Sequence, residues 1–260
     1  MNYRYQQPHP SIEEYVRTVI LIEGHSPDDS PALPLVTNGT AALYCKAEKM
    51  ENSGETLFEL ALYGSAVPAA ALAPNPQTTL LLYLFKPFAM PALFDIPAKQ
   101  AARAAVGFST LDPHRFNAIR IQMNYAGSLP EKTAILDNLM IQQIMLNKKN
   151  AALIRLATDR LLLHPEPGTL SQLISESGIT DRTFQRLFKK YVGLTANQYR
   201  RICQFQLSFS QLRSNEFEKL TDIAYDNGFA DQSHFNRSFR EFAQTTPQDY
   251  LRWGLKPKKQ

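Results

Sequence analysis

The sequence has few of the residues that build disulfide scaffolds, and no stretch suited to a membrane span. It contains two cysteines, Cys45 and Cys203, which fall in different halves of the 260 residues. We therefore expect no structural disulfide and a reducing compartment. The longest apolar run, Thr79–Phe85, is a strand length, whereas a membrane helix needs about 20 apolar residues. The N-terminal Met1–Pro10 has no apolar stretch typical of a signal peptide, so the expectation is a soluble, cytoplasmic protein with no membrane partner.

Motifs for catalysis and metal binding are also scarce. No two of the five histidines have the His-x-His or His-x-x-x-His spacing of metal ligands. Neither a phosphate-binding Gly-x-x-x-x-Gly-Lys loop nor a Gly-x-Ser-x-Gly nucleophile turn occurs. We expect no enzyme, no catalytic residue, no metal and no cofactor. A metal-binding barrel enzyme is the alternative, and stoichiometric metal after purification would distinguish it. The histidines are His9, His25, His114, His164 and His234.

The positive charge is unevenly divided along the chain. Residues 151–260 hold 16 Lys and Arg against 11 Asp and Glu, a net charge of +5. Residues 1–150 hold 12 against 13, a net charge of −1. A phosphate-binding domain requires such an excess, although a solvated basic face is also common.

The first half has the pattern of a β-rich domain. Short apolar or alternating runs are separated by Pro, Gly, Asn and Asp, which indicates a small barrel or sandwich and excludes long helices. Short helices are expected at Glu13–Val16 and near Ala98–Ala105. The predicted strands are Tyr15–Glu23, Ala41–Lys46, Thr56–Tyr63 and Thr79–Phe85.

Helical periodicity begins at Pro130. An apolar stripe over Leu136–Met145 predicts one helix, and Ala151–Leu163 predicts a second. The stripe indicates either core packing or a helix that pairs with a second copy of the chain. The fold class is therefore α+β, with a β-rich domain at 1–129, a helical linker at 130–164 and a helical domain at 165–260. The Pro/Gly cluster His164–Gly168 marks the entrance to the last domain.

The last domain contains one helix-turn-helix pattern twice, over Leu170–Lys189 and Leu220–Arg240. Matching residues of the two copies are 50 positions apart up to the turn glycine and 51 positions apart after it. The second copy therefore has one extra residue in its turn. The matched pairs are Leu170 with Leu220, Gly178 with Gly228, Phe184 with Phe235, Arg186 with Arg237, and Phe188 with Phe239. A glycine that ends one helix, followed by a capped helix with a basic polar face, is typical of an element that reads DNA.

Each second helix combines an apolar face with a polar one. The apolar face is expected to form the core, and it includes Phe184 and Phe188 in the first copy and Phe235 and Phe239 in the second. In the first copy, Thr180 is the expected N-cap, and the polar face at i, i+3, i+4 and i+7 consists of Arg182, Gln185, Arg186 and Lys189. In the second copy, Asp231 is the expected N-cap, and the same spacing gives Ser233, Asn236, Arg237 and Arg240. Gln232 and His234 lie in its first turn, where such modules contact bases, although His234 also fits a solvated role.

Base and phosphate contacts can be distinguished by residue type. Arg pairs with guanine and Gln with adenine, whereas Lys favours phosphate. We assign base reading to Arg182, Gln185, Arg186, Gln232, Ser233, Asn236 and Arg237, and phosphate contacts to Lys189, Lys190 and Arg240. Lys256, Lys258 and Lys259 are expected to form a basic tail. A long helix over Ala196–Leu212 would hold the two reading helices apart, and its apolar residues are expected to be mostly buried. They are Tyr199, Ile202, Phe205, Leu207, Phe209 and Leu212.

These residues resemble the AraC/XylS family of bacterial transcription regulators over Leu170–Tyr250. The most specific part of the match is Ile223-Ala224, Gly228-Phe229, Phe235, Arg237–Arg240 and Thr246–Tyr250, with Phe184–Lys190 and Gly193–Thr195 in the first copy. The resemblance implies two helix-turn-helix subdomains joined by a long helix. This sequence departs from the family pattern at three places. They are Gln244, where the family usually has glycine, Ala196, where proline is frequent, and Ile174-Ser175, where alanine is common.

The resemblance also implies a function for each half. The second half is expected to bind double-stranded DNA in a sequence-specific manner, and RNA polymerase is a further candidate partner. The first half resembles the cupin-like or otherwise β-rich sensory domains fused to this module, through the stretch Phe85–Phe94 and the helix after it. Such domains bind a small-molecule effector or form a homodimer. The same expectation for this chain rests on analogy between folds.

Overall fold

The computed structural model describes residues 2–23, 41–50, 56–64, 67, 71, 77–97, 104–147, 151–215 and 217–254. The chain divides into two compact units, one made of residues 1–151 with 190–193 and the other of residues 152–189 and 194–260. No helix among the described residues has the length and apolar character needed to cross a membrane. Lys256, Lys258 and Lys259 of the expected basic tail lie outside the described residues.

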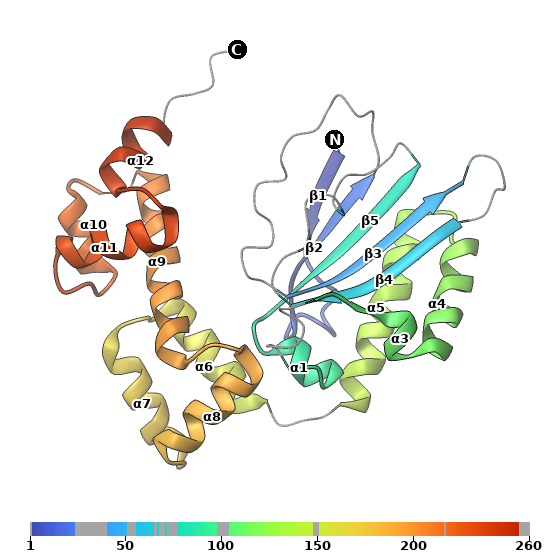
Figure 1. The fold of residues 1–260 in the computed structure, drawn as a ribbon, viewed down its shortest axis with the longest axis horizontal. Helices are drawn as coiled ribbons and strands as arrows, with labels where there is room; N and C mark the ends of the chain where they lie inside the picture. Colours follow the sequence, from blue (N-terminus) through green and yellow to red (C-terminus); the bar gives the residue numbers. More distant parts are fainter. Residues whose placement is uncertain are drawn as a thin grey trace. The chain divides into compact units, whose positions relative to one another are not determined.

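The first unit is built on a six-stranded antiparallel sheet in the order β1-β2-β5-β3-β4-β6 (Figure 1). The strands are β1 (Asn2–Gln6), β2 (Val16–Glu23), β3 (Ala42–Lys49), β4 (Thr56–Tyr63), β5 (Thr78–Phe85) and β6 (Val106–Gly107). The β-rich, α+β character that the sequence predicts is confirmed. In the described part of the chain the end strands β1 and β6 pair only with β2 and β4, so the sheet has two edges.

Strand β5 is apolar from Leu80 to Phe85, where it is central in the sheet and covered on both faces. Leu81 and Tyr83 point into a core shared with the helices, whereas Leu80 and Leu82 belong to a second apolar cluster on the opposite face. Successive side chains of a strand point to opposite faces, so a segment buried on both sides favours apolar residues at successive positions. The run that the sequence marks as the most apolar is thus the centre of the sheet.

Helices of the first unit cover one face of the sheet. They are α1 (Ala89–Phe94), α3 (Phe108–Leu111), α4 (Pro113–Tyr125) and α5 (Leu129–Leu146). Leu136, Leu139 and Met140 of α5 are buried in the core against the sheet, so the apolar stripe packs within its own unit. Met145 and Leu146, at the end of α5, remain largely exposed.

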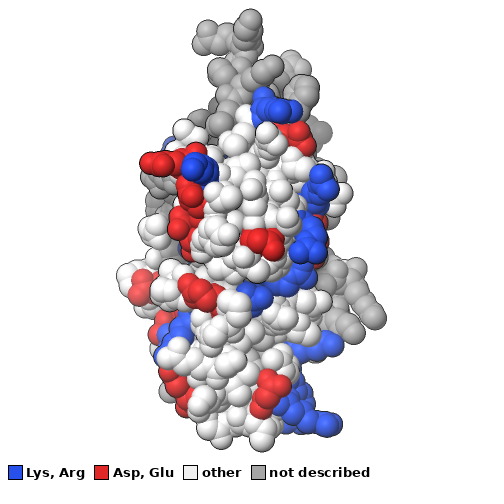
Figure 2. Space-filling view, turned by 90° about the vertical axis from the view of Figure 1, so that its left-hand side faces the viewer, with Lys and Arg blue, Asp and Glu red and all other residues white. Residues whose placement is uncertain are grey.

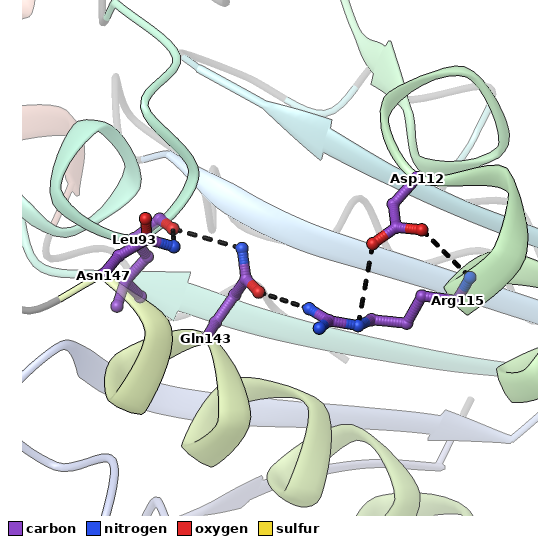
Figure 3. A network of polar contacts seen from close by, with 5 residues as sticks. All are labelled: Leu93, Asp112, Arg115, Gln143 and Asn147. Carbon is purple, nitrogen blue, oxygen red and sulfur yellow. Dashed lines mark hydrogen bonds and ion pairs between the residues drawn. The ribbon is translucent and has the colours of Figure 1, made fainter.

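A polar network joins the helices α1, α4 and α5 (Figure 3). The carbonyl oxygen of Leu93, in the last turn of α1, accepts hydrogen bonds from the amides of Gln143 at 3.2 Å and Asn147. Gln143 in turn accepts a hydrogen bond from the guanidinium of Arg115. Asp112 caps α4 by accepting from the backbone N–H of Arg115 at 3.0 Å, and its other oxygen lies 3.7 Å from Arg115 Nε. These contacts fix how α1 ends against α5.

The structure corrects one predicted helix. Glu13–Val16 is a hydrogen-bonded turn that leads into β2, because Tyr15 N–H and Val16 N–H both donate to the carbonyl of Ile12 at 2.9 Å. Pairing of Val16 with Phe85 of β5 then extends the chain and ends the helical turn. The helix expected at Ala98–Ala105 falls mainly on residues outside the described part of the chain.

The second unit is helical. Its helices are α6 (Ala152–Leu163), α7 (Pro167–Ser177), α8 (Asp181–Val192), α9 (Ala196–Ser214), α10 (Leu220–Asp226), α11 (Gln232–Ala243) and α12 (Pro247–Gly254). Helix α5 thus belongs to the first unit and α6 to the second, although the sequence places both in the segment 130–164. The long helix predicted from Ala196 is confirmed and continues to Ser214.

Candidate nucleic-acid interface

The first helix-turn-helix is formed by α7 and α8. Gly178 ends α7 in the left-handed region, at φ +67°, which costs glycine little because it has no Cβ. Thr180 then caps α8, since its hydroxyl oxygen accepts from the backbone N–H of Thr183 at 3.3 Å. Phe184 and Phe188 are fully buried on the inner face of α8. The predicted cap and core positions are confirmed.

The second helix-turn-helix, formed by α10 and α11, repeats this geometry. Gly228 has a φ of +71°. The carboxylate of Asp231 accepts from the backbone N–H of His234 at 2.7 Å and so caps α11. Phe235 and Phe239 are fully buried. Helix α11 begins four residues after its glycine and α8 begins three after its own, which is the extra residue that the repeat predicts.

The outer face of α8 carries most of the predicted contact residues of the first copy. Arg182, Arg186, Lys189 and Lys190 are exposed. Gln185 is partly exposed and donates a hydrogen bond to Asp181 Oδ1 at 3.3 Å, one turn earlier on the helix. A contact at this length is weak, so the amide of Gln185 is easily released to another partner.

The outer face of α11 matches that of α8. Ser233, Arg237 and Arg240 are exposed, and Gln232 and Asn236 are partly exposed. The ring of His234 packs edge-on against Phe229 at a centroid distance of 5.3 Å. His234 thus stands at the margin of the core and has less freedom to reach outward than its neighbours on the helix.

The arginines of these faces have no acidic partner within the described part of the chain, in contrast to others in the same unit. Arg160 pairs with Glu176 at 2.6 Å, and Arg201 of α9 pairs with Glu241 of α11. No such ion pair involves the exposed arginines Arg182, Arg186, Arg237 and Arg240. Figure 2 looks onto the second unit, where Lys and Arg gather along one edge and most Asp and Glu lie toward the centre and the other edge. Unneutralised cations on one side are suited to a polyanion.

Comparisons with known proteins agree with this geometry. A family model described as a helix-turn-helix domain matches residues 173–252. The regulatory protein SoxS of Salmonella typhimurium is 32% identical over 85 residues, which cover 33% of this chain and 78% of SoxS. The probable transcription factor PqrA of Proteus vulgaris is 30% identical over 88 residues, 34% of this chain and 71% of PqrA.

The chain belongs to the AraC/XylS family. It is accordingly a DNA-binding transcription regulator, and the relatives are regulators as well. Among solved structures, ToxT from Vibrio cholerae matches over 96% of this chain and 98% of its own, at 10% identity and a TM-score of 0.40. That likeness is too distant to carry an argument about the first unit. No group of three or more metal-binding side chains occurs among the described residues.

Two departures from the AraC/XylS pattern can now be placed in the structure. Gln244, where the family usually has glycine, is the C-cap of α11 and has a φ of +58°. Ala196, where proline is frequent, is the first residue of α9 after the cap Thr195, and the matching Pro247 starts α12 after Thr246. The family's glycine and proline therefore suit the backbone that these positions adopt.

Sequence reasoning missed a polar feature of α9. The stripe expected from its apolar residues is only partly correct, because Ile202, Phe205 and Phe209 are half-buried, whereas Gln204 and Ser208 are almost fully buried. Polar residues at helical spacing within an amphipathic helix were the signal. The amide nitrogen of Gln204 donates to a backbone carbonyl 23 residues away, that of Asn227, which only the folded chain identifies.

Proposed function

We propose that this regulator reads DNA through two successive major grooves, with α8 in one groove and α11 in the next. The observation that carries the proposal is the match between their outer faces. Three of the four repeat positions carry an amide or a basic side chain in both helices, Gln185 with Asn236, Arg186 with Arg237, and Lys189 with Arg240, and buried phenylalanines anchor the inner face of each helix. A helix of 19 residues such as α9 spans about 28 Å, and recognition helices on one face of a duplex lie about 34 Å apart.

The side chains divide into two roles. Arg182, Gln185 and Arg186 would contact base edges in one groove. Lys189, Lys190 and Arg240 would contact phosphates and position the protein. In the second groove the base-reading residues would be Gln232, Ser233, Asn236 and Arg237. His234 would act there only if its ring left Phe229.

Selection of duplex DNA from a random pool by the full-length protein tests the two-groove proposal. We expect enrichment of one motif about two helical turns long at near-physiological salt, with two conserved halves. Enrichment of a single short half would mean that one repeat reads bases and the other only clamps the backbone. Salt-sensitive binding without any enrichment would contradict sequence-specific reading by the protein alone.

For the first unit we propose a sensory or dimerising role in the cytoplasm. A cavity of about 490 Å³ lies between β1, β2 and the first turns of α5, and it is lined by charged groups that include Arg4, Glu23 and Asp137. Its volume is in the range of small-molecule sites. Screening of metabolites by thermal shift tests the sensory role. Molecular mass at micromolar concentration tests the dimer, and a strict monomer would rule it out. RNA polymerase is the protein partner that this function implies.

A further inference from the structure

Gln204 is a buried amide in the middle of α9, with 1% of its surface exposed. Its Nε2 donates to the backbone carbonyl of Asn227 at 3.0 Å, in the turn of the second helix-turn-helix. Its Oε1 lies 3.4 Å from Nη1 of Arg200, one turn earlier on the same helix. Both ends of the amide are therefore engaged inside the protein.

Arg200 extends this contact to the first helix-turn-helix. Its Nη1 donates to the backbone carbonyl of Pro165 at 2.8 Å, two residues before α7 begins. Burial lowers the pKa of Arg200, which reflects the enclosed position of the guanidinium. Four groups thus form one chain of contacts, from the entrance of the first motif to the turn of the second. They are Pro165, Arg200, Gln204 and Asn227.

The two segments joined in this way also approach each other closely. A Cβ at Gly228 would lie 3.6 Å from Cγ and 3.7 Å from Cα of Glu166. The turn is held at a second point by Gln211, whose Oε1 accepts from the side chain of Asn227 at 2.7 Å. Gln204 and Gln211 are seven residues apart, or about two helical turns, and so lie on the same side of α9.

This junction adds a constraint that α9 alone does not provide. The first motif packs on the start of α9 through Phe188 and Tyr199, and the second packs on its later part through Phe205 and Phe239. Without a cross-link, bending of the helix between these contacts would change the separation of α8 and α11. A buried amide with two fixed partners resists such bending, because leaving either partner unpaired is costly.

We infer that Gln204 and Arg200 are positioning residues that set the distance between the two recognition helices, and thereby the spacing of half-sites that the protein accepts. The inference rests on the two-groove function proposed above. One inserted base pair moves a half-site by about 3.4 Å along the duplex and turns it by about 35°. A rigid pair of readers loses the second contact under that change, whereas a flexible pair retains part of it.

The test uses full-length wild type, Gln204→Met and Arg200→Met, with Gln206→Met as a control at an exposed position of the same helix. Affinity is measured for the selected duplex, for versions with one base pair added or removed between its halves, and for each half alone. We expect wild type and Gln206→Met to lose about tenfold or more on a spacing change. Gln204→Met and Arg200→Met should lose no more than about threefold, with wild-type affinity for each half.

Each outcome has a distinct meaning. If wild type binds the selected duplex no more tightly than a single half, the two-groove proposal fails. If wild type needs both halves but is indifferent to their spacing, the positioning inference is overturned while the two-groove function stands. If wild type is sensitive and both methionine variants keep its tenfold discrimination, the positioning inference is overturned while the two-groove function stands. A general loss of structure cannot imitate the expected result, because an unfolded variant would also lose its affinity for the separate halves.

Discussion

Gly178 and Gly228 adopt the same left-handed backbone conformation, with φ values of +67° and +71°, at the turns of the two helix-turn-helix motifs. Their surroundings differ. A Cβ at Gly178 would meet no atom within 4 Å, whereas one at Gly228 would contact Glu166 and Gln204. The repeat therefore conserves the backbone of the turn, and the second turn has in addition become part of the junction with α9.

Substitution at Gly178 should isolate the backbone cost of the turn. We expect Gly178→Ala to lower the free energy of unfolding by about 1–2 kcal/mol, because a Cβ is unfavourable at positive φ and no neighbour obstructs it. Gly178→Asn should cost less, since asparagine tolerates this region better. Urea unfolding followed by circular dichroism measures both. An alanine variant as stable as wild type would contradict the assigned conformation.

At Gln244 the reverse substitution can be made, because a residue with a side chain occupies a position that favours glycine. It occupies the left-handed C-cap of α11 with φ +58°, so Gln244→Gly should raise the free energy of unfolding by about 0.5–1 kcal/mol, with part of the relief offset by the entropy of glycine. Gln244→Ala keeps the Cβ and should bring no gain. Thermal and urea denaturation of the three proteins compare them. Equal stabilisation by alanine and glycine would show that the backbone is not the cause.

Arg186 and Arg237 occupy the same repeat position, so their removal should have matching effects. Arg186→Ala and Arg237→Ala should each cost about 1–3 kcal/mol of specific binding and relax the preference at the contacted base pair. Arg213→Ala, an exposed arginine on α9, removes the same charge and serves as the control. Binding to the selected duplex and to its single-base variants is measured. Unchanged affinity and preference in both variants would defeat the assignment.

Lys189 should behave differently, because a phosphate contact carries no sequence information. Lys189→Ala is expected to weaken binding to all sequences alike and to reduce the slope of log K against log salt by about one. Titrations at several salt concentrations, on the selected and on an unrelated duplex, give both slopes. A loss confined to the selected duplex would instead place Lys189 at a base.

Asp137 should make the stability of the first unit depend on pH. Burial raises the pKa of this carboxyl, and the hydrogen bond donated by Tyr83 at 2.8 Å opposes the shift only in part. A raised pKa in the folded state means that the favourable contribution to stability is complete below the unfolded pKa and is lost as the pH rises through the folded one. Asp137→Asn keeps an acceptor for Tyr83 and removes the charge.

We therefore expect Asp137→Asn to gain thermal stability relative to wild type as the pH rises from about 3.5 to 7. Melting temperatures of both proteins across that range provide the comparison. A constant difference between Asp137→Asn and wild type at every pH would show that the carboxyl does not titrate in this way.

The sequence alone determined the features that depend on neighbouring residues. The caps Thr180 and Asp231 act on N–H groups three residues later, and the glycines of the turns act on their own φ angles. Helical spacing likewise placed Phe184 and Phe235 in the core. The strand Thr56–Tyr63 and the start of α9 at Ala196 were readable for the same reason, because their signals lie within a few residues.

Only the tertiary structure decided what depends on contacts between distant segments. The order of the strands, with β5 between β2 and β3, follows from pairings such as Leu21 with Leu81, which no local pattern encodes. Val16 joined a strand because Phe85 was available to pair with it. The role of Gln204 likewise depended on a carbonyl 23 residues away. Local signals fix where elements begin and end, whereas the burial of polar and apolar groups against distant partners fixes how those elements are held together.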